Sequence, residues 1–207
     1  MFNDRYGLTQ AVIDLIKTNT RRAERSLDVL PLYYNPLITE FLFEYKDGIV
    51  IGRRFFKGSH VETYHLKPRY KVGDEVAVAQ AYSSVFDELE ANVSLQEARP
   101  ILEQSESACL DNKMYVRASL MPHRIRITDI KVERLRDISE EDCIKEGLQW
   151  SHKASSHYVI DKTRIGSKQW FGSDARNAFG KLIDRISGKG TWERNPWVYA
   201  YEFELIK

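Results

Sequence analysis

The chain has 207 residues, of which 43% are hydrophobic and 29% charged, a composition typical of one globular domain with a sizeable core. Its 31 Lys and Arg side chains are balanced by 30 Asp and Glu, and this net charge of +1 excludes a protein that coats nucleic acid through a basic surface, but not a local basic site. No segment approaches the ~18 apolar residues of a membrane span, and Asn3, Asp4 and Arg5 interrupt the position of a signal peptide, so we expect a cytoplasmic protein with no membrane partner.

The most unusual stretch follows the first predicted helix, which covers residues 8–16 with Thr9 as its N-cap. Residues 17–22 read Lys-Thr-Asn-Thr-Arg-Arg and contain no apolar side chain. Such a run has no side chain that would pack in a hydrophobic core. It predicts either a solvated turn or one wall of an anion-binding or catalytic site at the C-terminal end of the helix, where the helix dipole favours cations.

Alternating apolar residues between turn signals predict β-strands at several places along the chain. The first two strands form a hairpin that turns at Asp47-Gly48, a dipeptide typical of two-residue hairpin loops. In chain order, the predicted strands cover residues 38–45, 49–56, 75–82, 113–120, 124–135 and 197–206.

Two helices are predicted in the second half of the chain. The first covers residues 138–147, with Ser139 as its N-cap and Asp142 at the capping-box position. The second begins after an N-cap at Ser173 and has an apolar stripe at helical spacing. Between them, residues 149–172 show poor periodicity and are predicted to form a long loop.

Five short motifs are distributed along the chain. They are Lys17-Thr-x-Thr-Arg-Arg after a helix, Gly73-Asp74 before a strand, Met121-Pro122 before the 124–135 strand, the 137–142 segment with Glu146-Gly147, and Trp192-x-x-Asn195-Pro196-Trp197 before the last strand. In this order they resemble the ASCH family, a branch of the PUA-like fold, and most of all its phage and prophage members. The resemblance implies an α+β fold, a PUA-like mixed β-barrel core with flanking helices, in one domain over residues 1–207. It also implies insertions at about 30–70, 84–112 and 150–172.

Some short ASCH proteins are amidohydrolases that remove the acetyl group from N4-acetylcytidine. Their Lys-x-x-Thr pair and a Glu near the end of a later helix match Lys17, Thr20 and Glu146, and an Arg follows the Thr as Arg22 does here. The family commonly has Gly two residues before the lysine. This chain has Leu15 there, and we expect leucine to narrow the backbone freedom and to add bulk beside the site.

Chemistry gives these three residues catalytic roles. A threonine hydroxyl is a poor nucleophile without a base, and a lysine can be that base where burial or a nearby cation lowers its pKa. Glu146 can orient the amine, pass a proton to the leaving amine or activate water. The alternative is that Lys17 and Thr20 lie on an exposed turn and that Glu146 pairs with a neighbouring cation.

Other side chains are candidates for ligand binding. Thr18, Arg21 and Arg22 would line the same polar pocket, and because one of two adjacent arginines commonly forms a surface ion pair, Arg22 is favoured as the clamp for a phosphate or carboxylate. Trp170 is the best candidate for stacking on a base. Arg124 belongs to a basic group that is either a phosphate track or an ordinary solvated face.

No metal and no cofactor are predicted. The histidines include two pairs five residues apart, His60/His65 and His152/His157, a spacing that suits neither one helix face nor a zinc loop. Neither of the two cysteines lies in a Cys-x-x-Cys pair, which fits reduced thiols. The chain contains no glycine-rich phosphate loop.

Three functions are compatible with these observations. The first is a PUA-like binding protein that recognises RNA, a nucleotide or a modified nucleobase through a polar pocket at residues 17–22. The second is an amidohydrolase of N4-acetylcytidine-like nucleosides that uses Lys17, Thr20 and Glu146. The third is a phage accessory protein that binds a host protein through the 84–112 or 149–172 segment.

Overall fold

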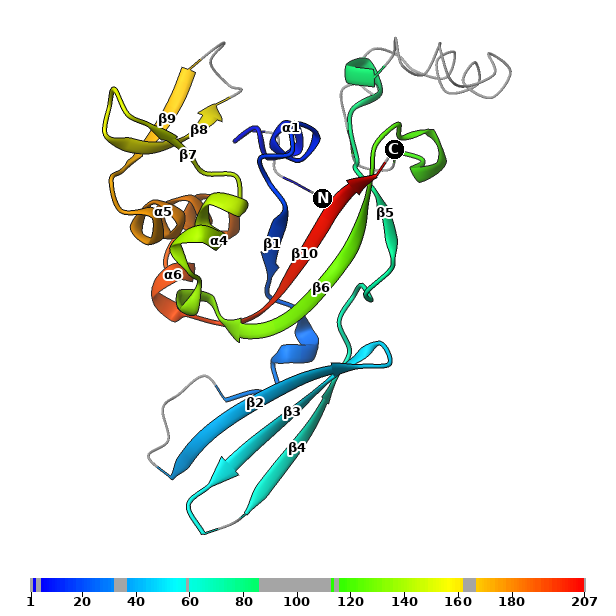
Figure 1. Ribbon diagram of the computed structural model, residues 1–207, viewed down its shortest axis with the longest axis vertical. Coiled ribbons are helices and arrows are strands. Elements are labelled where there is room, and N and C mark those ends of the chain that lie inside the picture. Colours follow the sequence, from blue (N-terminus) through cyan, green and yellow to red (C-terminus); the bar gives the residue numbers. More distant parts are fainter. Residues whose placement is uncertain are drawn as a thin grey trace.

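The fold is built on a four-stranded antiparallel sheet in which β1 lies beside β10 (Figure 1). The computed structural model describes residues 2, 5–31, 37–58, 60–85, 113, 116–161 and 167–206. The sheet has the order β1-β10-β6-β5, formed by β1 (Asn19–Arg22), β10 (Trp197–Ile206), β6 (Arg124–Arg134) and β5 (Glu75–Ala77). The predicted α+β class is confirmed, whereas the described part of the chain contains no closed barrel.

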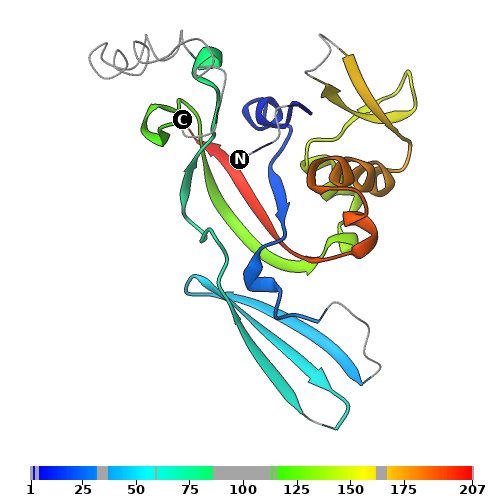
Figure 2. The ribbon, with the colours of Figure 1, turned by 180° about the vertical axis from the view of Figure 1, so that it is seen from behind.

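Two smaller antiparallel sheets lie at different ends of the main one (Figures 1 and 2). One contains β2 (Ile38–Lys46), β3 (Ile49–Phe56) and β4 (Val61–Leu66), and the other contains β7 (Gln149–Ser151), β8 (Ser156–Asp161) and β9 (Ser167–Gly172). The prediction of a long loop over 149–172 is therefore wrong. Val159 and Phe171 are buried there, but each strand is too short to show a clear alternation.

Among the helices whose bounds lie within the described residues, only α5 is long. These helices are α1 (Leu8–Ile13), α4 (Glu140–Lys145), α5 (Ala175–Ser187) and α6 (Thr191–Arg194), with 3-10 turns at Arg25–Leu27, Ala118–Leu120 and Leu135–Asp137. The predicted cap of α4 is confirmed, because Ser139 Oγ accepts a hydrogen bond from a backbone N–H three residues on, at 3.0 Å. Two other predicted caps are wrong: Gly7, not the buried Thr9, precedes α1, and Asp174, not Ser173, caps α5.

The strand predictions hold best where the alternation is long. The hairpin at Asp47-Gly48 is confirmed, and the φ angles of 51° and 83° at these residues are those of a type I′ turn. The strand predicted over 124–135 is present as β6. The strand predicted over 75–82 ends at Ala77, and residues 118–120 form a 3-10 turn instead of a strand.

Residues 17–22 do not form a solvated turn. Residues 19–22 are β1, an edge strand whose Arg21 lies opposite Ala200 and whose Arg22 lies opposite Tyr199 of β10. Because successive strand residues face opposite sides of a sheet, the two arginines point in opposite directions.

Hydrophobic residues pack on both faces of the main sheet. Tyr199 and Tyr201 of β10 belong to a cluster with β6 on one face. Val198, between Tyr199 and the start of the strand, packs instead with Cys143 of α4 and Phe179 of α5. Helices α4 and α5 therefore cover the face toward which Arg21 points.

Candidate functional site

A cavity of about 400 Å³ lies beside β1, where this strand meets α4 and α5. Its apolar wall comes largely from α5, and its polar wall from β1, the end of α4 and the segments that follow β1 and β4. The lining residues include the apolar Phe2, Phe179, Leu182, Ile183 and Ile186 and the polar Lys17, Thr20, Arg21, Arg22, Glu24, Arg69 and Glu146. Lys17, Thr20 and Glu146 thus converge on one cavity, and its volume is in the range typical of small-molecule sites.

Lys17 forms a buried ion pair with Glu146. Its Nζ donates to Glu146 Oε2 at 2.5 Å and to the Glu146 backbone carbonyl at 2.9 Å, and the residue is only 2% exposed. The chain around it is fixed as well, since the backbone N–H of Thr18 donates to the Lys145 carbonyl at the end of α4. Burial lowers the pKa of Lys17, and this outweighs the opposite effect of Glu146.

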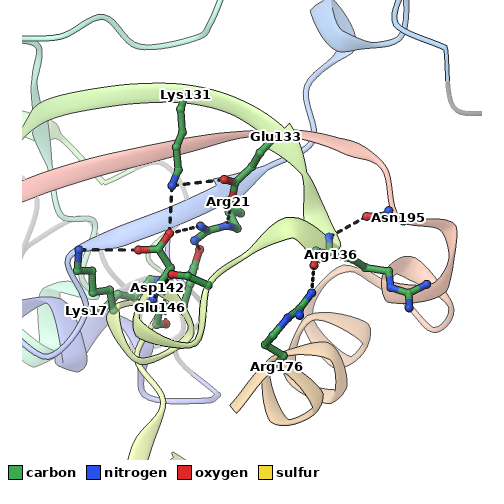
Figure 3. Close-up of polar contacts among 11 residues, drawn as sticks. Lys17, Arg21, Lys131, Glu133, Arg136, Asp142, Glu146, Arg176 and Asn195 are labelled. Carbon is green, nitrogen blue, oxygen red and sulfur yellow. Dashed lines mark hydrogen bonds and ion pairs between the residues drawn. The ribbon is translucent and has the colours of Figure 1, made fainter. Parts of the chain in front are cut away.

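Arg21 is next to this pair and contacts three carboxylates, one of which is that of Glu146 (Figure 3). Its Nε donates to Glu133 Oε1 at 2.6 Å, its Nη2 to Asp142 Oδ2 at 2.7 Å and its Nη1 to Glu146 Oε1 at 3.3 Å. Burial alone would lower the pKa of Arg21, but the surrounding carboxylates raise it. The side chain is fully enclosed, so the expectation that the other of the two arginines forms a surface ion pair is wrong.

Lys131 contacts two of these three carboxylates from the solvent-exposed side. Its Nζ contacts Glu133 at 3.3 Å and Asp142 at 3.1 Å. Lys131 reaches these groups because Ala200, the residue between Lys131 and Arg21 in the sheet register, has only a methyl side chain. Burial disfavours the ionised form of Asp142, yet hydrogen bonds from Arg21 and Lys131 lower its pKa below the ordinary value.

Thr20 and Arg22 lie on the opposite face of β1. Thr20 is opposite Tyr201 and Arg22 opposite Tyr199, both side chains are half-buried, and both line the cavity. Thr18 is not among the lining residues. Its backbone carbonyl accepts a hydrogen bond from the Phe203 N–H at 2.9 Å, so it fixes the entry to β1.

Two predicted ligand-binding residues lie away from the cavity. Trp170 of β9 is 41% exposed and packs 5.1 Å from the ring of Tyr158, and Arg124 of β6 donates to the Ala118 carbonyl. The expectation that Leu15 adds bulk beside the site is wrong, because its side chain is 65% exposed and does not line the cavity. Its φ of 59° does show that this position takes the left-handed conformation that favours glycine.

Sequence reasoning missed several residues of the site. The sequence could have indicated that Glu133 and Lys131 lie together, because residues two apart on a predicted strand share a face. Arg69 and Glu24 lie in irregular segments and in no motif. Most of the 84–112 segment, with Cys109, lies outside the described residues, and within the described residues no group of three His, Cys, Asp or Glu side chains could hold a metal ion.

Comparison with known proteins gave no relative. No protein-family model, curated protein or solved structure matches the chain. Within the described residues, no helix has the length and hydropathy of a membrane span.

Proposed function

We propose that the cavity beside β1 binds a nucleobase, as a nucleotide, a modified nucleoside or a nucleotide of RNA. The observation that carries this proposal is the convergence of Lys17, Thr20, Arg22 and Glu146 on one cavity of about 400 Å³. The apolar wall from α5 suits the face of a base, and the polar wall offers donors and acceptors to its edge. The order of the motifs supports a distant relation to ASCH proteins, in which the main sheet corresponds to a PUA-like barrel core with insertions.

Binding is tested by isothermal titration of the full chain with cytidine, N4-acetylcytidine, the other nucleosides and short single-stranded RNAs. We expect binding that Arg22→Ala weakens and that Arg124→Ala leaves unchanged, because Arg22 lines the cavity and Arg124 does not. Binding that depends equally on both arginines would place the ligand elsewhere, and no binding to any member of the panel would refute the proposal.

A second function, hydrolysis of an acylated nucleobase, is favoured by the state of Lys17. Its ammonium is 2.5 Å from the Glu146 carboxylate, burial lowers its pKa, and Thr20 lines the same cavity. In this mechanism neutral Lys17 accepts the hydroxyl proton as Thr20 Oγ1 attacks the acetyl carbonyl. The C–N bond then breaks, the leaving amine takes up a proton, and water hydrolyses the acyl-threonine. Alternatively, Glu146 activates a water that attacks directly.

The two routes differ in their dependence on Thr20. Cytidine release from N4-acetylcytidine is followed by liquid chromatography for the wild type, Thr20→Ala and Thr20→Ser. A threonine nucleophile predicts loss of turnover in Thr20→Ala and partial retention in Thr20→Ser, whereas attack by water predicts that both variants retain turnover. Cytidine release by the wild type no faster than in buffer would exclude hydrolysis of this substrate while leaving base binding unaffected.

A further inference from the structure

The charged residues of the cavity fall into two groups with different balances. At the α4 end, the buried cations Lys17 and Arg21 contact three carboxylates, those of Glu133, Asp142 and Glu146. Glu133 and Asp142 do not line the cavity, and Lys131 contacts both of them, so three cations match three carboxylates in this network. Because these charges are already paired, this end suits an uncharged polar group.

Where β1 ends, two arginines line the cavity together with one glutamate. They are Arg22 of β1 and Arg69 of the segment between β4 and β5, and the glutamate is Glu24. Glu24 Oε1 accepts a hydrogen bond from the Tyr201 hydroxyl at 2.7 Å, and Oε2 accepts one from the Arg69 backbone N–H at 2.9 Å. The carboxylate is thus directed toward these two donors, and it ties the Arg69 segment to the end of β1.

We propose that this end binds a phosphate group, so that the cavity takes a nucleoside phosphate in preference to the free nucleoside. The inference rests on the proposed nucleobase binding. A guanidinium matches the geometry of phosphate oxygens, which arginine contacts through paired N–H groups, and two arginines line this part of the cavity. With the phosphate at Arg22 and Arg69, the base lies along the apolar wall of α5, and its polar edge faces Lys17 and Glu146.

Arg69 becomes a specificity-determining residue in this arrangement. It is exposed, with its Cζ 5.6 Å from the ring centroid of Tyr70, and it lies in no motif of the sequence. Its backbone N–H also donates to the Tyr201 hydroxyl oxygen, at 3.2 Å, so the segment is anchored where it lines the cavity. Truncation of the side chain should therefore leave the fold intact.

The test is isothermal titration of the full chain with cytidine, cytidine 5′-monophosphate, N4-acetylcytidine, its 5′-monophosphate and a hexanucleotide RNA. We expect each monophosphate to bind about tenfold more tightly than its nucleoside, the effect of one hydrogen-bonded charge pair. Arg69→Ala should remove that difference and change nucleoside affinity less than about twofold. The matched control is Arg53→Ala, which truncates an exposed arginine of β3 paired with Glu44.

The outcomes separate this inference from the proposed function. Equal affinities for nucleoside and monophosphate, or a monophosphate preference that survives Arg69→Ala, would overturn the phosphate site while base binding stands. No binding by any ligand would overturn both. If the hexanucleotide and the monophosphates both bind more tightly than the nucleosides, and both lose this advantage in Arg69→Ala, the phosphate site is supported whether the phosphate belongs to a mononucleotide or to RNA. If the Arg69-dependent advantage is larger for the hexanucleotide than for the monophosphates, the phosphate group belongs to RNA.

Discussion

The two faces of β1 carry similar polar side chains in opposite surroundings. On the face toward α4, Arg21 is fully enclosed and bonded to three carboxylates. On the other face, the next residue, Arg22, is half-buried beside Tyr199 and lines the cavity. One step along a strand thus separates a side chain that is enclosed by ion pairs from one that is half-buried at the cavity. Sequence alone does not distinguish the two, because the difference lies in which residues cover each face.

The largest expected effect comes from removing the enclosed charge. Arg21→Met leaves Glu133, Asp142 and Glu146 close together with one of their cations lost, and loss of one partner of a buried ion pair destabilises by about 3–5 kcal/mol. Arg22→Met should lower the free energy of unfolding by less than about 1 kcal/mol. Urea denaturation of both variants measures the difference, and similar losses would show that both faces of β1 are structural.

A smaller effect is expected where α4 ends beside Lys17. Gly147 has a φ of 104°, and a Cβ there would lie 3.1 Å from Leu8 Cδ2 and 3.6 Å from Lys17 Cβ. Gly147→Ala should destabilise by about 1–2 kcal/mol through backbone strain alone, and by more if Leu8 cannot move. Gly73→Ala is the matched control, because its φ is 91° and a Cβ there meets nothing within 4 Å. Equal losses in thermal unfolding of the two variants would mean that the contact with Leu8 and Lys17 is unimportant.

The enclosed face should also give the protein an acid-sensitive contribution to stability. The pKa of Asp142 is lowered in the folded state, so folding favours its ionised form. That contribution is fully present above the unfolded-state pKa, about 4, and is lost as the pH falls through the folded-state pKa. We expect Asp142→Asn to be less stable than the wild type by about 1 kcal/mol at pH 7, and this difference to shrink as the pH falls below the unfolded-state pKa. A difference that persists at low pH would contradict this assignment.

The smallest effect is expected at Leu15, which precedes the polar run. Glycine would relieve the left-handed strain at its φ of 59°, about 1 kcal/mol, but loses about 0.5–1 kcal/mol through the greater freedom of the unfolded chain. Leu15→Gly should therefore change stability by less than about 0.5 kcal/mol and ligand affinity by less than about twofold. A larger change in affinity would show that this side chain influences the cavity from the exposed surface.

The sequence predicts the parts of the fold in which hydrophobic periodicity is long. Strands β6 and β10 and the stripe of α5 follow from apolar spacing, and the Asp47-Gly48 turn follows from its residue types. β1 was missed because its inward face is charged, so its burial leaves no apolar signal. The β7–β9 sheet was missed because its strands are short.

The candidate site was predicted in part. Lys17, Thr20 and Glu146 came from the family resemblance, and they do share a cavity. Asp142 was interpreted as a capping residue, but its carboxylate contacts Arg21 and Lys131, whose proximity depends on the pairing of distant strands. Arg69 reaches the cavity from an irregular segment, and no local pattern indicates such a position.

The pairing of β1 with β10 determines when the molecule can be completed during its synthesis. Residues 19–22 leave the ribosome well before their strand partner, which covers residues 197–206, and Lys17 and Glu146 are 129 residues apart. Contacts of such long range form late in folding. Until then β1 is a strand without its partner, the kind of segment that promotes aggregation when it is apolar. Because its side chains are hydrophilic, β1 stays solvated until its partner is available. The polarity that hides this strand from sequence-based prediction therefore also protects the growing chain from aggregation.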